Sequence, residues 1–338
     1  MPKTAPNGPS VLTIVLNYRT PELTIKATRA ALHDMEGITG EIVVVDNGSG
    51  DDSCAMIAAA IKTEGWNRVS LKQAGRNGGF GAGNNVAMQA GLSDGTKPDF
   101  VYILNSDAWP DPGAIRALLN VMQADPKVGI AGSAIRGEDD VPHQTAFRFP
   151  SIAGEFEGAV RTGIVTRLLK DHVVPLEVPQ GLTRVDWVAG ASVLFRQTML
   201  DQIGLFDETF FLYFEETDLC LRAARAGWHA VYVPDSRVVH VGSVSTGMKT
   251  WRRTPGYWFD SRQHYFVKNH GALYAAGATV ARATGAALWR LRVALSRKPL
   301  NDPPHFLRDL LTHAATSLLR IGRRSGRVAQ NTMAGGAK

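Results

Sequence analysis

The sequence has few cysteines and no long hydrophobic run. Only two cysteines, Cys54 and Cys220, occur in 338 residues. This excludes a disulfide scaffold and a cysteine-rich zinc site, and it favours reduced thiols in a cytoplasmic protein. The polar first ten residues lack the apolar core of a signal peptide. The longest apolar candidate, residues 271–289, is interrupted by Arg282, so we expect no membrane-spanning helix.

Charge is distributed unevenly along the chain. The net charge is +6, but residues 249–338 contain 16 lysines and arginines against three acids, whereas residues 1–248 carry a net charge of −7. A basic C-terminal quarter suits an anionic partner, whether nucleic acid, a membrane surface or a substrate. No recognised nucleic-acid-binding module accompanies the charge, so we expect no nucleic-acid partner.

Strand and helix signals alternate over the first 135 residues. Short apolar, β-branched runs such as Val11–Leu16, Glu41–Val45 and Phe100–Leu104 are separated by helical patterns. This alternation predicts an α/β fold with a mainly parallel sheet between helices. The following segment, residues 137–179, is irregular and charged, and we expect a flexible insertion there.

Polar side chains directly follow three of these strands. They are Asn17, Asp46 and the group Asn105–Asp107. Ligands of open α/β sheets bind at the carboxyl ends of the strands. Asn105 and Asp107 can direct oxygen atoms toward one hard cation, Mg²⁺ or Mn²⁺. Alternatively, the same residues form only a turn.

Two further groups carry reactive side chains. Glu215 and Glu216 follow the apolar run 210–214 at the start of a predicted helix. Acids suit a helix N-terminus, but apolar surroundings also raise a carboxyl pKa and make it a useful general base. His240 ends a strand, where it is either a hydrogen-bonded structural residue or a metal ligand.

A glycine-rich loop covers residues 76–84 and precedes a helix predicted over Asn84–Ala90. Glycines let the backbone approach a ligand closely, and the following helix N-terminus suits an anion. The loop lacks the phosphate-loop motif and follows no long strand, so it does not define a dinucleotide fingerprint.

Taken in order, these motifs resemble those of the family 2 glycosyltransferases with a GT-A fold, especially the bacterial rhamnosyltransferase-like branch. The resemblance covers about residues 10–270. It rests on seven segments: Ile14–Tyr18, Val43–Ser49, Asn77–Gly81, Leu104–Asp107, Trp187–Ala191, Glu215–Arg222 and His240–Ser243. It implies a Rossmann-like GT-A domain over residues 1–248, followed by a basic helical extension.

The implied domain has two halves. Its nucleotide-sugar half lies at about residues 10–135, and its acceptor half at about residues 180–248. The extension covers residues 249–338, and we expect its last twelve or so residues to be disordered. Its helices would contact either an anionic membrane surface or a second copy of the chain in a homodimer.

The resemblance also implies roles for individual residues. Asn105 stands where the family has the first acid of a D-x-D motif, so one anionic metal ligand is missing and the effect on metal dependence is open. The nucleotide and donor sugar would be bound by Asn17, Arg19, Asp46, Arg76, Asn77, Gly79, Asn105 and Ser106. A Mn²⁺ or Mg²⁺ ion would be bound by Asp107, His240 and Asn105.

The acceptor side is implied in the same way. Trp187, Gly190, Ala191 and Asp218 would shape the sugar and acceptor pocket. Glu216 would act as the base, with Glu215 as the alternative. Arg252 and Arg253 would neutralise the diphosphate.

These roles together predict an inverting, non-processive, metal-dependent hexosyltransferase. It would transfer a sugar, rhamnose from dTDP- or UDP-rhamnose as the first expectation, to a hydroxyl of a saccharide or polyprenyl-linked acceptor in cell-surface polysaccharide synthesis. The enzyme would be cytoplasmic or peripheral on the inner face of the plasma membrane.

The sequence also permits comparison with other functions. The alternative kept open is a catalytically impaired carbohydrate- or nucleotide-binding relative, or a scaffold at the membrane surface. A nucleotidylyltransferase is disfavoured because the chain lacks an N-terminal glycine-rich loop. A processive synthase is disfavoured because the Q-x-x-R-W motif and membrane spans are missing.

Overall fold

The fold is described from a computed structural model, which covers residues 8–242, 252–296 and 303–317. Two sequence-based expectations lie outside these residues, the disorder of the last twelve or so residues and any role of Ser243. No helix within the described ranges has both the length and the apolar character needed to cross a membrane.

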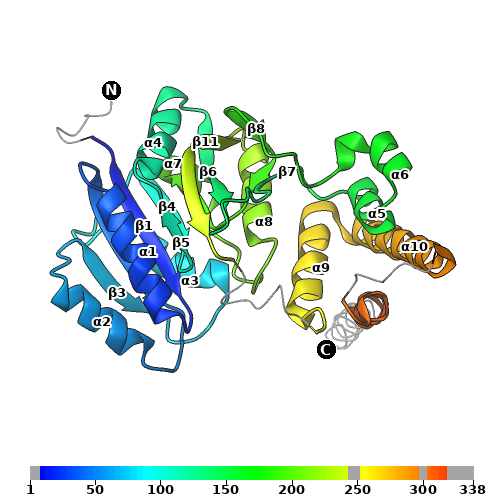
Figure 1. The fold of residues 1–338 in the computed structure, drawn as a ribbon, viewed down its shortest axis with the longest axis horizontal. Helices are drawn as coiled ribbons and strands as arrows, with labels where there is room; N and C mark the ends of the chain where they lie inside the picture. Colours follow the sequence, from blue (N-terminus) through cyan, green and yellow to red (C-terminus); the bar gives the residue numbers. More distant parts are fainter. Residues whose placement is uncertain (1–7, 243–251, 297–302, 318–338) are drawn as a thin grey trace, which may run out of the picture. The chain divides into compact units, whose positions relative to one another are not determined.

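The chain divides into two compact units (Figure 1). The first, here called the sheet unit, comprises the described parts of residues 1–149 and 174–250. The second, here called the helical unit, comprises the described parts of residues 150–173 and 251–338. The sequence-based boundary near residue 248 placed residues 150–173 in the first domain. In the structure they belong to the same unit as the C-terminal helices.

The main sheet of the sheet unit is mixed and mainly parallel. Strands β1 to β4 run parallel to one another, whereas β10 runs antiparallel to β4 and β6. The order is β3-β2-β1-β4-β10-β6-β11-β5, with β8 beside β11. The strands are β1 (Ser10–Asn17), β2 (Thr39–Asp46), β3 (Val69–Gln73), β4 (Phe100–Asn105), β5 (Ala108–Pro110), β6 (Val128–Arg136), β8 (Thr183–Val185), β10 (Ser192–Arg196) and β11 (His229–His240).

Helices cover both faces of this sheet. Alternate residues of β1 enter two separate cores, because successive strand side chains point to opposite faces: Val11 and Val15 belong to one core, Leu12 and Ile14 to the other. Helices α1 (Pro21–Asp34), α2 (Ser53–Thr63) and α4 (Ala114–Ala124) contribute to the first core. Helices α3 (Phe80–Ala90), α7 (Gln197–Ile203) and α8 (Glu215–Arg225) contribute to the second.

Helix α3 begins at Phe80, four residues before the predicted start. Glycine lowers helix propensity, so the sequence pattern counted Gly81 and Gly83 as loop. A Cβ at Gly81 would lie 2.9 Å from Cβ of Phe206, and one at Gly83 would lie 2.5 Å from Cδ1 of Leu16. These glycines therefore serve the close packing of α3 on the sheet unit.

The helical unit combines two distant parts of the chain. Helices α5 (Ile152–Val160) and α6 (Gly163–Leu168) and a 3₁₀ turn at Lys170–His172 come from the first part. Helices α9 (Gly256–His270) and α10 (Ala272–Ser296), with helical residues 306–317, come from the second. Helix α5 packs on α10, so the prediction of a flexible, irregular insertion was wrong for residues 150–173.

A short two-stranded sheet, β7 (Ala146–Phe147) with β9 (Trp187–Val188), lies in the sheet unit.

A buried charge cluster joins these helices. Glu155 of α5 is 7% exposed and accepts hydrogen bonds from Arg262 of α9 at 2.8 Å and from Arg282 of α10 at 3.2 Å. Burial opposes ionisation of Glu155, but the charges of the two arginines outweigh it and hold the pKa of this carboxyl below its usual range. Removing one partner of a buried ion pair strongly destabilises the folded state. The cluster therefore stabilises the packing of α5 on the C-terminal helices.

Candidate active site

Asn17 and Asp46 end the neighbouring strands β1 and β2 and are register partners. Asn17 Nδ2 donates to Asp46 Oδ1 at 2.8 Å, and the hydroxyl of Ser49 donates to the same oxygen at 2.5 Å. Burial opposes ionisation of Asp46, but hydrogen bonds from Ser49 and Asn17 outweigh it and hold its pKa below the usual range. Asp46 is therefore a fixed anion at neutral pH.

Ser49 ends the Val43–Ser49 motif and was not among the predicted site residues, yet it connects Asp46 to Arg19. Its hydroxyl accepts a hydrogen bond from the amide of Arg19 at 3.0 Å, and its carbonyl accepts one from Arg19 Nε at 2.9 Å. Arg19 itself has a left-handed backbone, with φ 58°. The D-N-G-S turn sequence was the available signal, because Asp and Ser side chains commonly bond backbone groups in turns.

The loop before α3 joins the same corner. Asn47 Nδ2 donates to Asn77 Oδ1 at 3.1 Å and to the Gly79 carbonyl at 3.0 Å. The amide of Phe80 donates to the carbonyl of Phe211 at 3.0 Å. The structure thus connects the predicted nucleotide loop both to the end of β2 and to the segment that precedes Glu215.

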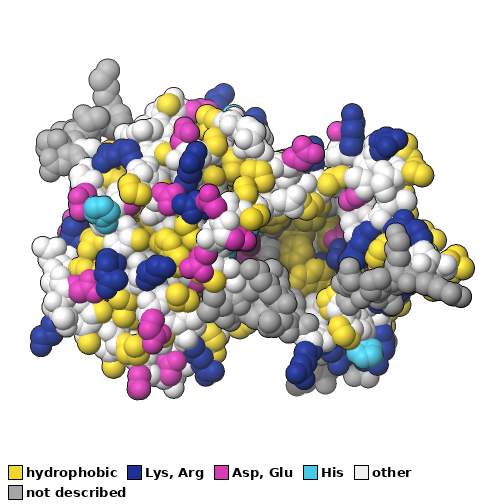
Figure 2. All heavy atoms as spheres, in the orientation of Figure 1, with side chains coloured by type: hydrophobic (Ala, Val, Ile, Leu, Met, Phe, Trp, Pro, Cys, Tyr) yellow, Lys and Arg dark blue, Asp and Glu magenta, His cyan; other side chains and the backbone are white. Residues whose placement is uncertain are grey.

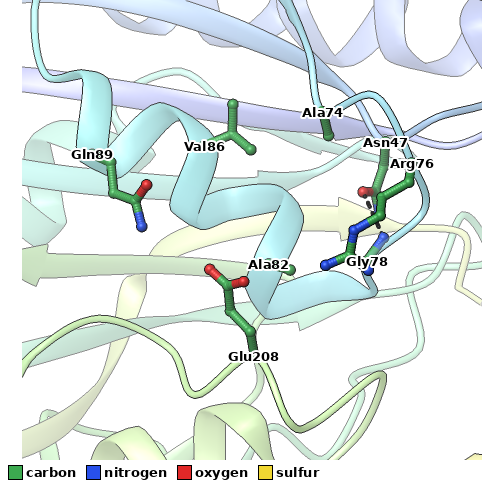
Figure 3. Close-up of a pocket in the computed structure, with 8 residues that line it drawn as sticks. All are labelled: Asn47, Ala74, Arg76, Gly78, Ala82, Val86, Gln89 and Glu208. Atoms are coloured by element: carbon green, nitrogen blue, oxygen red, sulfur yellow. Dashed lines mark hydrogen bonds between the residues drawn. The ribbon is translucent and has the colours of Figure 1, made fainter.

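A cavity of about 200 Å³ lies beside this loop (Figure 3). Arg76, Glu208 and Gln89 give it polar walls, and small side chains of α3 line it between them. The lining residues are Asn47, Ala74, Arg76, Gly78, Ala82, Val86, Gln89 and Glu208. Arg76 therefore borders open space next to Asn47, where a small polar ligand group could fit.

The second group gathers at the ends of β4 and β11. His240 Nε2 lies 3.1 Å from Asp107 Oδ1 and 3.3 Å from Asn105 Nδ2. Ser106 accepts a hydrogen bond from the Thr20 hydroxyl at 3.1 Å, which connects this turn to the start of α1. Residues 135 positions apart in sequence, Asn105 and His240, are thereby brought together as the sequence motifs implied.

The donor set of this group can be compared with what a divalent cation needs. No cluster of three His, Cys, Asp or Glu side chains that could hold a metal occurs in the described parts of the chain. Asp107 and His240 nevertheless bring one carboxylate oxygen and one imidazole nitrogen within 3.1 Å of each other, and the amide group of Asn105 lies beside the same imidazole. Oxygen and imidazole donors suit Mn²⁺, and Mg²⁺ commonly takes only one or two carboxylates plus phosphate oxygens, so the set fits such an ion.

The third group is the acid pair at the start of α8. Tyr213 and Phe214 both have left-handed backbones, with φ 69°, and they turn the chain into the helix. Glu215 is 2% exposed, whereas Glu216 is half-buried with its Oε2 enclosed. Within the described residues, neither Oε2 atom has a hydrogen-bond partner.

The enclosure changes the acidity of both groups. Burial, together with the charge of Glu216, raises the pKa of Glu215 well above its usual range. Burial raises the pKa of Glu216 to about 7. A carboxyl that titrates near neutral pH is well suited to accept a proton in a reaction.

The predicted acceptor-side segment, residues 187–191, contacts both the turn at Asn105 and the start of α3. Trp187 stacks on Phe147 with ring centroids 4.0 Å apart, and its Nε1 donates to the carbonyl of Arg148 at 2.9 Å. The carbonyl of Ala191 accepts a hydrogen bond from the Asn105 amide at 2.9 Å. A Cβ at Gly190 would lie 3.1 Å from the ring of Phe80 at the start of α3.

Asp218 has a clear structural partner. It is fully buried, and its Oδ2 accepts a hydrogen bond from Arg222 Nε at 2.9 Å. Arg222 also donates to the backbone carbonyls of residues 203–205. This clamp was missed from the sequence, although the i, i+4 spacing of an acid and an arginine on a helix was available as a signal.

The two arginines assigned to the diphosphate belong to the helical unit. Both are exposed, and Arg253 forms a two-bond ion pair with Asp309 at 2.6 and 2.7 Å. Their assignment stays a prediction.

A family model described as glycosyltransferase like family 2 matches residues 9–266. The chain therefore belongs to the family 2 glycosyltransferases, as its motifs implied. It is 34% identical over 218 residues to an N-acetylglucosaminyl-diphospho-decaprenol L-rhamnosyltransferase of Mycobacterium tuberculosis. This match covers 61% of this chain and 68% of that relative. It is 27% identical over 165 residues to the rhamnosyltransferase WbbL of Escherichia coli, covering 48% and 60%.

Solved structures agree on the fold. The mannosyltransferase PcManGT from Pyrobaculum calidifontis, solved with GDP-Man and Mn²⁺, has a TM-score of 0.55 and 18% identity, covering 96% of this chain and 84% of that one. The predicted GT-A fold with C-terminal helices is confirmed.

Proposed function

We propose that this glycosyltransferase moves rhamnose from a nucleoside diphosphate carrier to a hydroxyl of a polyprenyl-diphosphate-linked saccharide, with inversion at the anomeric carbon. Its likeness to the N-acetylglucosaminyl-diphospho-decaprenol L-rhamnosyltransferase supports the sugar and the acceptor class. The observation that carries the chemistry is the enclosed Glu216 carboxyl, whose pKa is raised to about 7. It belongs to the same unit as Asp46 and Asp107.

The donor nucleoside would bind at the ends of β1 and β2. Asp46 is an anion held by Asn17 and Ser49, so it would accept hydrogen bonds from a base or ribose. Arg19 is anchored through its backbone amide and its Nε. Asn77 and Gly79, connected to Asn47, would complete the pocket, with Arg76 beside them.

Asp107, His240 and Asn105 would hold a Mn²⁺ or Mg²⁺ ion. When bound, the ion would neutralise charge on the leaving diphosphate. The chain supplies a single carboxylate at this turn, since Asn105 replaces an acid. We therefore expect a weakly held metal, whose binding depends on the nucleotide.

Glu216 would act as the base in a single displacement. Its carboxylate takes the proton of the acceptor hydroxyl while that oxygen forms a bond to the anomeric carbon. The bond from that carbon to the diphosphate oxygen breaks, and its electron pair leaves with the nucleoside diphosphate. Burial, together with the charge of Glu216, raises the pKa of Glu215, so one acid of this adjacent pair would keep its proton while the other is ionised.

Two measurements on the purified chain test this function. Thermal stabilisation by dTDP, UDP and their sugars, each with Mn²⁺, Mg²⁺ or EDTA, identifies the carrier, because a ligand of the folded state raises the melting temperature. Transfer from that carrier's rhamnose conjugate to a polyprenyl-diphosphate N-acetylglucosamine then tests the reaction. Stabilisation without transfer to this or any other offered acceptor would favour the nucleotide-binding alternative, and failure of both would exclude the proposal.

A further inference from the structure

Large apolar side chains are exposed mainly on the helical unit. Eight of the twelve exposed large apolar residues among the described residues belong to it. Five of these eight are on α10: Leu273, Val280, Leu288, Leu291 and Leu295, which are 92, 64, 46, 59 and 79% exposed. At 3.6 residues per turn, these five fall within an arc of about 80°. They are called the α10 stripe below.

Helix α10 has the reverse of the usual surface pattern. Its buried face carries mostly small residues, including Ala275, Ala278 and Gly285, and a Cβ at Gly285 would lie 2.8 Å from the Phe156 carbonyl of α5. A surface helix normally buries its large apolar residues and exposes polar ones. The leucines of the α10 stripe are therefore not required for packing within the unit. An exposed apolar strip of this kind, interrupted only by exposed Thr284 near its middle, indicates a binding surface.

The charge beside the stripe is positive. Helix α10 contains three arginines and no acid. Arg282 is used in the cluster with Glu155. Arg290 and Arg292 lie on opposite sides of the stripe, about 120° and about 80° from its centre, and Arg292 also donates to the Thr162 hydroxyl and the Arg161 carbonyl. Arg292 and Arg161 also contact the ring of Trp289, at 4.9 and 5.5 Å from its centroid.

From this pattern we infer that the α10 stripe lies in the surface of an anionic lipid bilayer. The stripe spans the 23 residues from Leu273 to Leu295, which extend about 33 Å along a helix that would lie parallel to the membrane plane. Its leucines would enter the acyl boundary, and Arg290 and Arg292 would lie among the phosphate groups on either side.

The same charges argue against a second copy as the occupant. Two α10 helices packed through this stripe would bring their arginines together without an acid on either helix to pair with them. Lipid phosphates supply the missing countercharge. The inference concerns the helical unit alone and does not depend on the proposed transferase reaction.

Vesicle flotation with the full chain, in the absence of any nucleotide sugar, tests the inference. We expect binding to phosphatidylglycerol vesicles and little binding to phosphatidylcholine vesicles. Salt should weaken the binding without abolishing it, because screening acts on the arginines and not on the leucines. The triple change Leu288→Ser, Leu291→Ser and Leu295→Ser should weaken it about 100-fold or more, since each inserted leucine is worth roughly a factor of ten.

The matched control is Val141→Ser with Leu182→Ser, two exposed apolar residues of the sheet unit, which should leave binding unchanged. Undiminished binding of the triple variant to phosphatidylglycerol would overturn the inference. The inference would also be overturned if the chain did not bind vesicles but sedimented as a dimer, and if the triple change dissociated that dimer.

A second measurement covers the case in which the triple variant does not fold. In a Cys54→Ser background, an environment-sensitive fluorophore on Leu291→Cys should shift its emission to the blue when phosphatidylglycerol vesicles are added. The same label on Leu182→Cys should not. Unchanged emission from both positions would refute the inference.

Discussion

Gly79 and Phe211 touch so closely that position 79 has no room for a side chain. A Cβ there would lie 1.8 Å from the carbonyl oxygen of Phe211, and Gly79 has a left-handed φ of 90°. Because Phe80 also donates its amide hydrogen to that carbonyl, the loop carrying Asn77 is joined to the segment before Glu215. The donor loop and the acid pair are thus parts of one packed arrangement.

The first prediction concerns this contact. Gly79→Ala should lower the free energy of unfolding by at least about 3 kcal/mol, because it adds a backbone collision to a strained φ. Gly75→Ala is the control, since Gly75 has a φ of 76° but no heavy atom within 4 Å of its Cβ position. It should cost about 1–2 kcal/mol from the left-handed backbone alone. Urea unfolding measures both, and equal losses would show that the collision is relieved.

The second prediction is a loss of turnover in Glu216→Gln. The amide cannot accept the acceptor proton, so turnover should fall by about 10²–10⁴-fold. The melting shift produced by the nucleotide donor should stay close to that of the unchanged chain. Glu138→Gln, at an exposed position, is the control and should retain full turnover. An active Glu216→Gln chain would remove Glu216 from the role of base.

The third prediction is a pH dependence of the chemical step. Burial raises the pKa of Glu216 to about 7, and only its ionised form accepts a proton. Single-turnover rates should therefore rise with pH and level off above about 7, with a rate at pH 6 about tenfold below the plateau. A profile that is flat between pH 6 and pH 8 would be inconsistent with this assignment.

The fourth prediction concerns stability. Burial raises the pKa of Glu215 in the folded chain, so the folded state binds more protons than the unfolded state above the ordinary glutamate pKa. Its contribution to folding is then greatest at low pH and is lost as pH rises toward the folded-state pKa. Glu215→Gln removes this loss and should stabilise the chain at pH 8, with little effect near pH 4. Calorimetry at both pH values measures the two stabilities, with Glu177→Gln at an exposed position as the control. A Glu215→Gln chain that is less stable than the unchanged chain at pH 8 would contradict the prediction.

The fifth prediction addresses the pair Asp107 and His240. Asp107→Asn leaves no carboxylate in this donor set, so the affinity for the nucleoside diphosphate in Mn²⁺ should fall about 10- to 100-fold. In EDTA the two chains should bind it equally. Asp94→Asn, at an exposed position, is the control. Titration calorimetry measures the affinities, and identical values in Mn²⁺ would exclude Asp107 as a ligand.

Much of the sheet unit could be predicted because its signals are local. Buried strands such as Val11–Leu16 appear as β-branched runs, and polar residues such as Asp46 and Asp107 follow them directly. Because parallel strands end on the same side of a sheet, those residues then lie on one side of the sheet unit. The acid pair at Glu215 and Glu216 was recognised in the same way, from apolar residues on one side and a helix on the other.

The C-terminal helices were predicted, but their packing with residues 150–173 could not be, because its signals are distant and weak. Gly277 and Gly285 of α10 pack against α5, and small residues give little periodic signal. The pairing of Glu155 with Arg262 joins positions 107 residues apart. The Arg222 clamp, by contrast, used a spacing that the sequence displayed, but its backbone partners at residues 203–205 depend on the tertiary fold.

The separation of α5 from α10 along the chain has a consequence for biosynthesis. Glu155 leaves the ribosome 127 residues before Arg282, a delay of roughly 6–25 s at about 5–20 residues per second. During that interval α5 has no α10 to pack against, while the strands β8, β10 and β11 emerge and pair. A ribosome-bound chain stopped once β11 has left the exit tunnel, but before α10 has, should therefore protect its sheet from protease while residues 150–173 are cut. The sheet, and with it the edge that carries Asp46 and Asp107, would be finished before the helical unit can form.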